Sequence, residues 1–357
     1  MMQLSIPTIT EKMKDKVLEV LDSARFIKGS NIAAFEEEFS RYCGVKYGVS
    51  VNSGTSAIFL ALKALGIKEG DEVIVPSHTF IASATPILMV GAKPVFVDIG
   101  EDFLMDMSDV ENKVTSRTKA VICVHLYGQI CDMTRLAQLK EECGFSIIED
   151  CCQAHGSEYK GKKAGSFGDI ACFSFFPSKN MTVAGDGGIA ITYDENLYNI
   201  MKMLRDHGRD YSTKEGKYIS TMLGYNFRMS EISAALGLCQ LELLNEWSER
   251  RREIATQYDE MLTDDVIIPM VGENRKHVYH LYVIRTKKRE ELGNFLHKNG
   301  IETGIHYPIP VHKQPIFEYC KLPVTEKICD EILSIPIYPL MNNEQVLQVC
   351  NKINEFF

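Results

Sequence analysis

Short apolar runs alternate with longer amphipathic stretches over the first two thirds of the chain. The apolar runs, many of them rich in β-branched residues, predict strands at 72–76, 94–98, 120–124, 146–150, 170–175 and 188–192. Helical spacing marks residues 133–143 and, ahead of the first predicted strand, the whole stretch 11–65. Apolar strands separated by helices are typical of a mostly parallel sheet buried on both faces. The pattern therefore predicts an α/β fold.

The last third of the chain has a different pattern. A long helical stretch covers residues 230–261, an alternating segment lies at 280–284, and another helix is predicted near 288–299. We predict a large α/β domain with an N-terminal helical segment over residues 1–245, and a small α+β domain over residues 246–357. The long helix joins the two.

Composition and charge exclude several classes of function. The chain has 357 residues, of which 45% are apolar and 24% charged, with a net charge of -9. These are ordinary globular values, and without a basic run they give no sign of a nucleic-acid partner. No apolar run approaches the roughly 20 residues that span a bilayer, and the N-terminus becomes charged too early for a signal peptide.

The cysteines are informative about metals and compartment. The chain contains 11 of them, scattered singly except for Cys151 and Cys152, without a CxxC pair or a His/Cys cluster at zinc spacing. We therefore predict free thiols, no metal site and a cytoplasmic location.

Two residues follow strand ends and point to chemistry. Lys179 comes after the run 170–175 in the aromatic segment FSFFPSKN, where partial burial favours the neutral, nucleophilic amine. Asp150 ends the run 146–150, where a poorly hydrated carboxylate needs a cationic partner, and Glu149 points to the opposite face. Both would face one crevice, since ligands bind beyond the carboxyl ends of parallel strands. The alternatives are a solvated loop lysine and an aspartate that caps the next helix.

Other residues could complete a site for an anionic, aromatic ligand. Gly54, Thr55 and Ser56 begin a predicted helix, where free amides and the helix dipole attract phosphate, although Ser and Thr also simply cap helices. Ser174 offers a further hydroxyl. Phe80 could stack on a ring or belong to the core, and Gln153 could contact a ring hydroxyl or be an ordinary polar helix residue.

Several segments match, in order along the chain, the signatures of one enzyme family. They are 53–57, 149–156, 173–180, 185–188, 207–209 and 224–229. Together they resemble the DegT/DnrJ/EryC1/StrS family of sugar aminotransferases, which use pyridoxal 5'-phosphate (PLP). The resemblance extends from about residue 5 to the C-terminus. It implies the aspartate aminotransferase-like fold, with a mostly parallel sheet of the seven-stranded type flanked by helices and a small C-terminal α+β domain.

The resemblance also implies roles for individual residues. Lys179 would carry PLP as a Schiff base and shuttle the proton. Asp150 would pair with the pyridinium nitrogen, while Gln153 contacts the ring hydroxyl and Phe80 stacks on the ring. The phosphate would be held by the residues of the helix start and the nearby hydroxyl, namely Gly54, Thr55, Ser56 and Ser174. Asn226 would reach the cofactor of a neighbouring subunit, which makes the active unit a homodimer.

Small departures from the family pattern leave the chemistry intact. Cys151 and Cys152 replace the usual Ala-Ala after the aspartate, and Ser178 replaces the usual Thr before the lysine. Relatives with His in place of the lysine are dehydratases, so Lys179 favours transamination.

The family's substrates are an amino donor, usually L-glutamate, and a keto-sugar carried on a nucleotide. Tyr307 and His306 belong to a proline-rich segment, 305–312, which either borders the sugar or is a structural turn. Its His-Tyr-Pro-Ile-Pro form resembles enzymes that aminate C3 of UDP- or dTDP-linked 3-keto hexoses. Positive groups available for the diphosphate are His207, Arg209, Lys217, Arg228 and 250–252, although the arginine run 250–252 fits a solvated helix face better.

Three alternatives stay open at this point. One is amination at C4 of a nucleotide-linked 4-keto-6-deoxyhexose. Another is amination of a free cyclitol ketone. The last is a non-catalytic regulator that keeps the fold.

Overall fold

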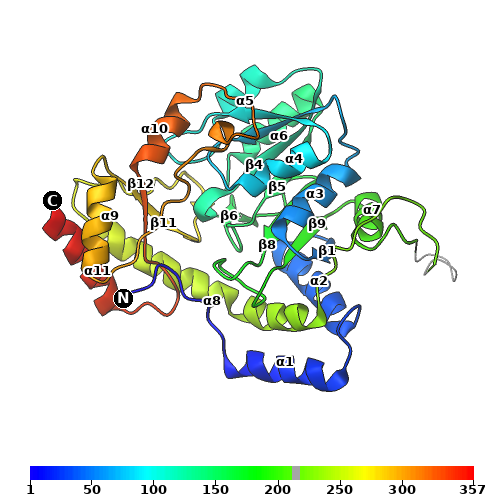
Figure 1. Ribbon diagram of the computed structural model, residues 1–357, viewed down its shortest axis with the longest axis horizontal. Coiled ribbons are helices and arrows are strands. Elements are labelled where there is room, and N and C mark those ends of the chain that lie inside the picture. The colour runs from blue at the N-terminus through cyan, green and yellow to red at the C-terminus, as the bar shows by residue number, and fades with distance from the viewer. Residues whose placement is uncertain (211–217) are drawn as a thin grey trace.

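The central feature of the computed structural model is one sheet of seven strands in the order β1-β9-β8-β5-β4-β2-β3 (Figure 1). The structure describes residues 1–210 and 218–357, so Lys217 lies outside the described residues. The strands are β1 Tyr47–Val51, β2 Glu72–Pro76, β3 Lys93–Val97, β4 Thr118–Val124, β5 Ser146–Asp150, β8 Ile170–Ser174 and β9 Gly188–Thr192. All neighbours pair in parallel except β9, which is antiparallel to both β1 and β8. The predicted mostly parallel α/β sheet is confirmed.

One part of the predicted pattern is wrong. The stretch 11–65 is not helical throughout, because strand β1 lies inside it. Helices α1 (Glu11–Ser23), α2 (Ser30–Cys43) and α3 (Gly54–Ala64) surround this strand. Gly44 ends α2 in the left-handed conformation, with φ 75°. The next residues become a strand because they pair with all of β9, a partner that lies more than a hundred residues away.

Helices cover the sheet, and their ends are fixed by local signals. The remaining helices of this region are α4 (Thr85–Met89), α5 (Met107–Lys113), α6 (Met133–Cys143) and α7 (Glu195–Arg205). The carboxylate of Asp132 accepts the N–H groups of Thr134 and Arg135 at the start of α6, and Gly144 ends it with φ 77°. Strands β2 and β9 are buried along their whole length, as expected for a sheet covered on both faces.

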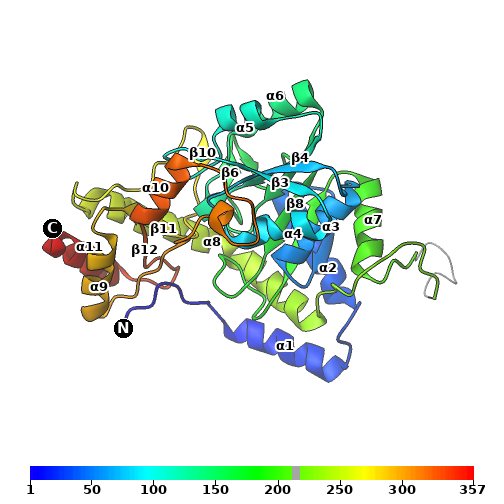
Figure 2. The ribbon, with the colours of Figure 1, turned by 45° about the horizontal axis from the view of Figure 1, so that its top comes forward.

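A smaller unit forms at the other end of α8 (Glu231–Met261), the longest helix (Figure 2). It contains β11 (Tyr282–Arg285) paired antiparallel with β12 (Ile332–Ile335), and helices α9 (Arg289–Lys298), α10 (Pro323–Glu331) and α11 (Asn343–Phe356). Three two-residue strands, β6 (Glu158–Tyr159), β7 (Lys162–Lys163) and β10 (Arg275–Lys276), form a separate small sheet. Helix α8 passes through the predicted domain boundary, and the division at residue 245 stays a prediction.

The first residues of the chain lie against this smaller unit. The Met2 N–H donates to the Gly300 carbonyl over 2.7 Å, and the Leu4 carbonyl accepts the Ile337 N–H over 3.2 Å. Both ends of the chain therefore lie near α9 and α11, as the two ribbon views show.

The prediction that the arginine run 250–252 forms a solvated helix face is wrong. Arg251 is 3% exposed, and its guanidinium donates to the carbonyls of Tyr279, His280 and Ile337. Burial lowers its pKa to about 10. Arg250 donates to the Met341 carbonyl. These contacts tie the long helix to the smaller unit, and they explain why arginine stands at a buried helix position. Among the helices of the described residues, none has the length and apolarity needed to cross a membrane.

Candidate active site

A cavity of about 420 Å³ lies beyond the carboxyl ends of β2, β5 and β8. Its volume falls within the range of about 300–1,000 Å³ usual for small-molecule sites. It is lined by predicted site residues from five parts of the chain, namely Gly54, Thr55, Phe80, Asp150, Gln153, Ser174, Lys179, His306 and Tyr307. The topology explains this convergence, because parallel strands end at the same edge of the sheet.

Lys179 follows β8 in a tight turn, where its N–H donates to the Phe176 carbonyl over 2.8 Å. Removal from water lowers the pKa of its amine, and nearby Cys152 and Asp150 act in the opposite direction. A lysine in this setting loses its proton more easily than an exposed one. The amine is therefore suited to attack a carbonyl carbon, as the sequence predicted.

Asp150 is held from two sides at the end of β5. The Ser83 hydroxyl donates to Oδ2 over 2.7 Å, and the Cys152 N–H donates to Oδ1 over 3.1 Å. Thr79 in turn lies 2.8 Å from the Ser83 hydroxyl. This buried carboxylate faces the cavity with few donors of its own, so a cationic ligand atom is its natural partner.

Glu149 points away from the cavity, as the alternation along a strand predicts. Its carboxylate accepts the N–H groups of Gly165, Phe167 and Gly168 at 2.7–2.9 Å and lies 3.0 Å from His125 Nε2. Together with Cys151 this forms a compact His-Glu-Cys group in the core. Because protein donors already occupy both carboxylate oxygens, the group is suited to a structural role, and the absence of a metal site stays a prediction.

The start of α3 forms one wall of the cavity. Ser53 caps the helix, because its hydroxyl accepts the Ser56 N–H over 3.1 Å. The Ser56 hydroxyl lies 3.0 Å from the Ser53 hydroxyl and does not line the cavity, whereas Gly54 and Thr55 do. A Cβ at Gly54 would lie 2.8 Å from both Cys152 Sγ and Ser174 Cβ. The helix start is therefore packed directly against the loops that carry Asp150 and Lys179.

The opposite wall comes from the C-terminal third. The ring centroids of Tyr307 and Phe80 are 5.5 Å apart. The Tyr307 hydroxyl accepts a hydrogen bond from Gln153 Nε2 over 3.1 Å. Phe80 is 52% exposed, so its face is open to a ligand. His306 Nδ1 lies 2.8 Å from the Ser334 hydroxyl, and burial together with Lys179 lowers the pKa of His306 to about 4. Near neutral pH this ring is uncharged.

Besides Ser56, two predicted residues lie outside this cavity. Asn226 is exposed and bridges to Asp206 through its backbone. Arg228 forms an ion pair with Asp206 and lines a separate small cavity with Arg205 and Lys28. Neither reaches the Lys179 pocket of its own chain.

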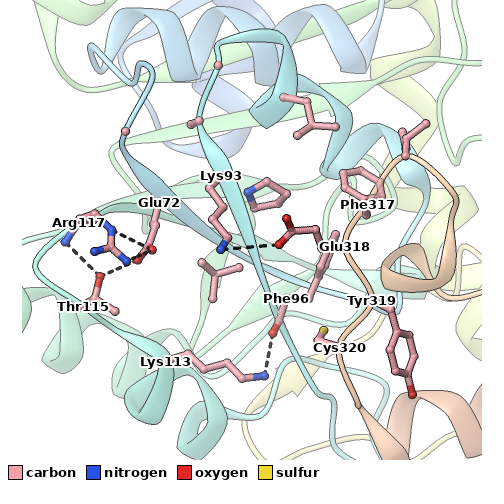
Figure 3. A pocket seen from close by; sticks show the side chains of 17 residues that line it. Glu72, Lys93, Phe96, Lys113, Thr115, Arg117, Phe317, Glu318, Tyr319 and Cys320 are labelled. Carbon is pink, nitrogen blue, oxygen red and sulfur yellow. Dashed lines mark hydrogen bonds and ion pairs between the residues drawn. The ribbon is translucent and has the colours of Figure 1, made fainter.

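The largest cavity is elsewhere on the molecule. It measures about 900 Å³ and lies beside edge strand β3 and residues 316–320 (Figure 3). Its charged groups are already paired. Glu72 accepts from Thr115 and Arg117, Lys113 donates to the Phe96 carbonyl, and Lys93 faces Glu318 across 3.9 Å. The Lys93 and Glu318 side chains are exposed, whereas the smaller cavity brings Lys179 together with the buried carboxylate of Asp150. The smaller cavity is therefore the candidate active site.

Comparison with known proteins identifies the family. The model of the DegT/DnrJ/EryC1/StrS aminotransferase family matches residues 7–354. The chain belongs to this family. The prediction drawn from the motifs is thereby confirmed, and the family is PLP-dependent.

Curated relatives match along nearly their whole length. The chain is 41% identical to the pleiotropic regulatory protein of Geobacillus stearothermophilus, covering 97% of this chain and 96% of the relative. It is 42% identical to GDP-perosamine synthase of Escherichia coli O157:H7, covering 98% and 97%. It is 41% identical to UDP-N-acetyl-3-dehydro-alpha-D-glucosamine 3-aminotransferase of Acidithiobacillus ferrooxidans, covering 96% and 94%.

A solved structure of an aminotransferase relative shows the same fold. DesV of S. venezuelae is 39% identical and superposes with a TM-score of 0.93, covering 97% of this chain and 94% of that chain. Likeness at this level confirms the aspartate aminotransferase-like PLP fold predicted from the motifs.

The cavity of this aminotransferase suits PLP in its donor set. The Lys179 amine, whose pKa is lowered by burial, would suit the aldehyde of that cofactor, and the buried Asp150 carboxylate would suit its pyridine nitrogen. The start of α3 at Gly54 and the nearby Ser174 would suit its phosphate.

Sequence reasoning missed several residues of the pocket. Ser83 donates to the Asp150 carboxylate from just beyond β2, and Thr79 contacts the Ser83 hydroxyl. Asp186 and Phe176 also line the cavity. Their place after strand ends was a usable signal for Ser83 and Thr79. The contact between Ser83 and Asp150, which are 67 residues apart, depends on the β2-β4-β5 strand order and has no local signal.

Proposed function

We propose that this protein is a PLP-dependent aminotransferase that moves an amino group from L-glutamate to C3 of a UDP- or dTDP-linked 3-keto hexose. The observation that carries the proposal is the placement of Lys179, Asp150 and the start of α3 around one cavity. PLP supplies an electron sink that stabilises negative charge on the substrate carbon.

Each part of the cavity has a role in holding the cofactor. Lys179 would bind it covalently, and Asp150 would pair with its pyridine nitrogen. The amides of Gly54 and Thr55 and the hydroxyl of Ser174 would hold the phosphate. Phe80 would cover the ring, and Gln153 would contact the ring hydroxyl. Ser56 contributes through the backbone of the helix start, since its hydroxyl is engaged with Ser53.

Lys179 has a second task once the amino acid is bound. Its amine would take the proton from the substrate α-carbon and hold it on Nζ for its later return. Its lowered pKa supports this task, because a base must be unprotonated near the working pH.

The segment 305–312 supports amination at C3. His306 and Tyr307 line the cavity, and His306 is neutral, so it offers hydrogen bonds to a sugar and no fixed charge. The relative from Acidithiobacillus ferrooxidans, which is named as a 3-aminotransferase, supports the same position. Amination at C4 or of a cyclitol is the alternative on the same cofactor chemistry.

The active unit is a homodimer in this proposal. Asn226 is exposed and lies outside its own cavity, as a residue that serves a neighbouring subunit would. Arg228 is half-buried beside it and would meet the nucleotide part of a substrate only across that interface. The 11 free cysteines support a reducing, cytoplasmic compartment.

A regulator without catalysis is the competing proposal, and one relative carries a regulatory name. Retention of both Lys179 and Asp150 at the cavity favours an enzyme. The deciding experiment gives purified holoenzyme L-glutamate and then a panel of nucleotide-linked 3-keto and 4-keto sugars. Loss of the absorbance band of the lysine-bound cofactor, its return with a 3-keto sugar, and a 3-amino product by NMR are expected. A holoenzyme that is inert to every amino donor and ketone would contradict the proposal, and protection from thermal unfolding by UDP or dTDP would speak against a cyclitol substrate.

A further inference from the structure

Tyr127 stands out among the buried residues near the cavity. It is 2% exposed and belongs to the short 3-10 segment Leu126–Gly128, which follows β4. Its backbone is left-handed, with φ 58° and ψ 0°. A non-glycine residue pays a conformational cost there, and such residues persist where the surrounding contacts demand them. Tyr127 does not line the cavity itself, so it cannot be recognised as a functional residue from the cavity lining.

The hydroxyl of Tyr127 belongs to a series of hydrogen bonds that all run in the same direction from donor to acceptor. It donates to the His306 carbonyl, so its oxygen accepts from His78 Nε2, which lies 2.7 Å away. Nδ1 of that histidine is then the acceptor, and Cys329 Sγ lies 3.3 Å from it. Burial lowers the pKa of His78 to about 3, which agrees with a neutral ring that has one donor and one acceptor.

The backbone of the same residue fixes the amide of Gln153. The Tyr127 N–H donates to Gln153 Oε1 over 2.7 Å, so Nε2 must point the other way. That Nε2 donates to the Tyr307 hydroxyl over 3.1 Å. The Tyr307 oxygen is thereby an acceptor, which leaves its proton free to point into the cavity.

From these contacts we propose that Tyr127 is a positioning residue, whose hydroxyl and N–H together hold His306, Tyr307 and Gln153 in the geometry that the reaction needs. Its hydroxyl anchors the backbone of the cavity wall, and its N–H selects the donor face of the amide. The inference rests on the proposed function, because it concerns the same cavity.

Tyr127→Phe removes only the hydroxyl and keeps the ring and the N–H. The matched control is Tyr159→Phe, because Tyr159 is 6% exposed, donates to Asp132 over 3.1 Å, and lies outside the cavity. The Tyr127 hydroxyl contacts His306 and the buried His78, whereas the Tyr159 hydroxyl contacts the less buried Asp132 and Thr134. Tyr127→Phe should therefore lose at least as much thermal stability as the control. Only Tyr127→Phe should slow the single-turnover conversion by saturating L-glutamate, by about tenfold, while the absorbance band of the bound cofactor stays in place.

A double variant separates positioning from general loosening. If Tyr127 acts through the 306–307 segment, the Tyr127→Phe/Tyr307→Phe pair should be slowed no more than Tyr307→Phe alone. A Tyr127→Phe rate within about twofold of wild type, or effects that multiply fully in the pair, would overturn the inference. Failure of the wild-type holoenzyme to react with any amino donor is a different result, which would remove the proposed function itself.

Discussion

Replacing Gly54 by alanine tests how tightly the helix start is packed against the cofactor loops. A Cβ at this position would lie 2.8 Å from Cys152 Sγ and 2.8 Å from Ser174 Cβ. Apolar atoms prefer separations of about 3.5–4.0 Å, so these neighbours or the helix must move by about 0.7–1.2 Å. The start of α3 is the element most easily displaced, and it carries the amides proposed to hold the phosphate.

The expected cost combines two opposing effects. Overpacking of this size costs about 1–3 kcal/mol. Alanine in a helix returns at most about 1 kcal/mol relative to glycine. The cofactor-free Gly54→Ala variant should therefore lose about 0–2 kcal/mol of unfolding free energy. Its affinity for PLP should fall by about tenfold or more, because a displaced helix start weakens the phosphate contacts.

Urea unfolding of the cofactor-free protein measures the first effect, and a PLP titration followed by absorbance measures the second. Gly293→Ala is the matched control, since a Cβ there would meet Thr303 and Leu333 at the ordinary distances of 3.6 and 3.7 Å in the middle of α9. It should stabilise the protein by up to about 1 kcal/mol and leave PLP affinity unchanged. A Gly54→Ala variant with wild-type PLP affinity would refute the phosphate role of the helix start, and a variant stabilised as much as Gly293→Ala would refute the close packing.

Further predictions concern the carboxylate, the lysine and the long helix. Ser83→Ala removes the 2.7 Å hydrogen bond to Asp150. It should lower the free energy of unfolding, measured with urea, by about 1.5–3 kcal/mol, and it should weaken PLP binding. An unchanged free energy of unfolding and an unchanged PLP affinity would show that the carboxylate is held without this bond. The pKa of Lys179 is lowered from 10.5 in the folded chain, so the unfolded chain binds more protons between the lowered value and 10.5. The stability of the cofactor-free protein should therefore rise with pH across that window, and Lys179→Met should remove this rise. Arg251→Met leaves three buried carbonyls without their donor and should cost about 3 kcal/mol, whereas Arg252→Met, which loses an ion pair within one helix, should cost about 0.5 kcal/mol or less; equal losses would contradict the buried role.

The sheet was largely predictable because its strands are continuous apolar runs. Segments 72–76, 146–150 and 188–192 were predicted to the residue. The strand at 47–51 was missed because Gly48 and Ser50 interrupt its apolar positions. Ser50 is polar for a tertiary reason, as its hydroxyl donates to Glu36 over 2.7 Å and its carbonyl accepts from Arg205. No local pattern carries that information.

Some residues of the candidate site could likewise be predicted from the sequence, and others could not. Asp150 is the last residue of β5 and Lys179 lies in the loop that follows β8, so the general rule for parallel sheets places them at one edge. Ser56 was taken for a phosphate contact because Ser at a helix start suits either role, and its hydroxyl is instead engaged with the cap residue Ser53. Arg251 looked solvated because helical spacing alone does not reveal which carbonyls of a distant segment a guanidinium meets. The contacts of Tyr127 depend on residues that lie 26, 49 and 179 positions away in sequence.

The central claim is that Lys179 carries the cofactor. Holoenzyme reduced with borohydride, digested and mapped by mass spectrometry should show the cofactor's mass on the peptide that contains Lys179, and pretreatment with L-glutamate should prevent the label. A label on another lysine, or none on a protein that binds PLP, would contradict the account.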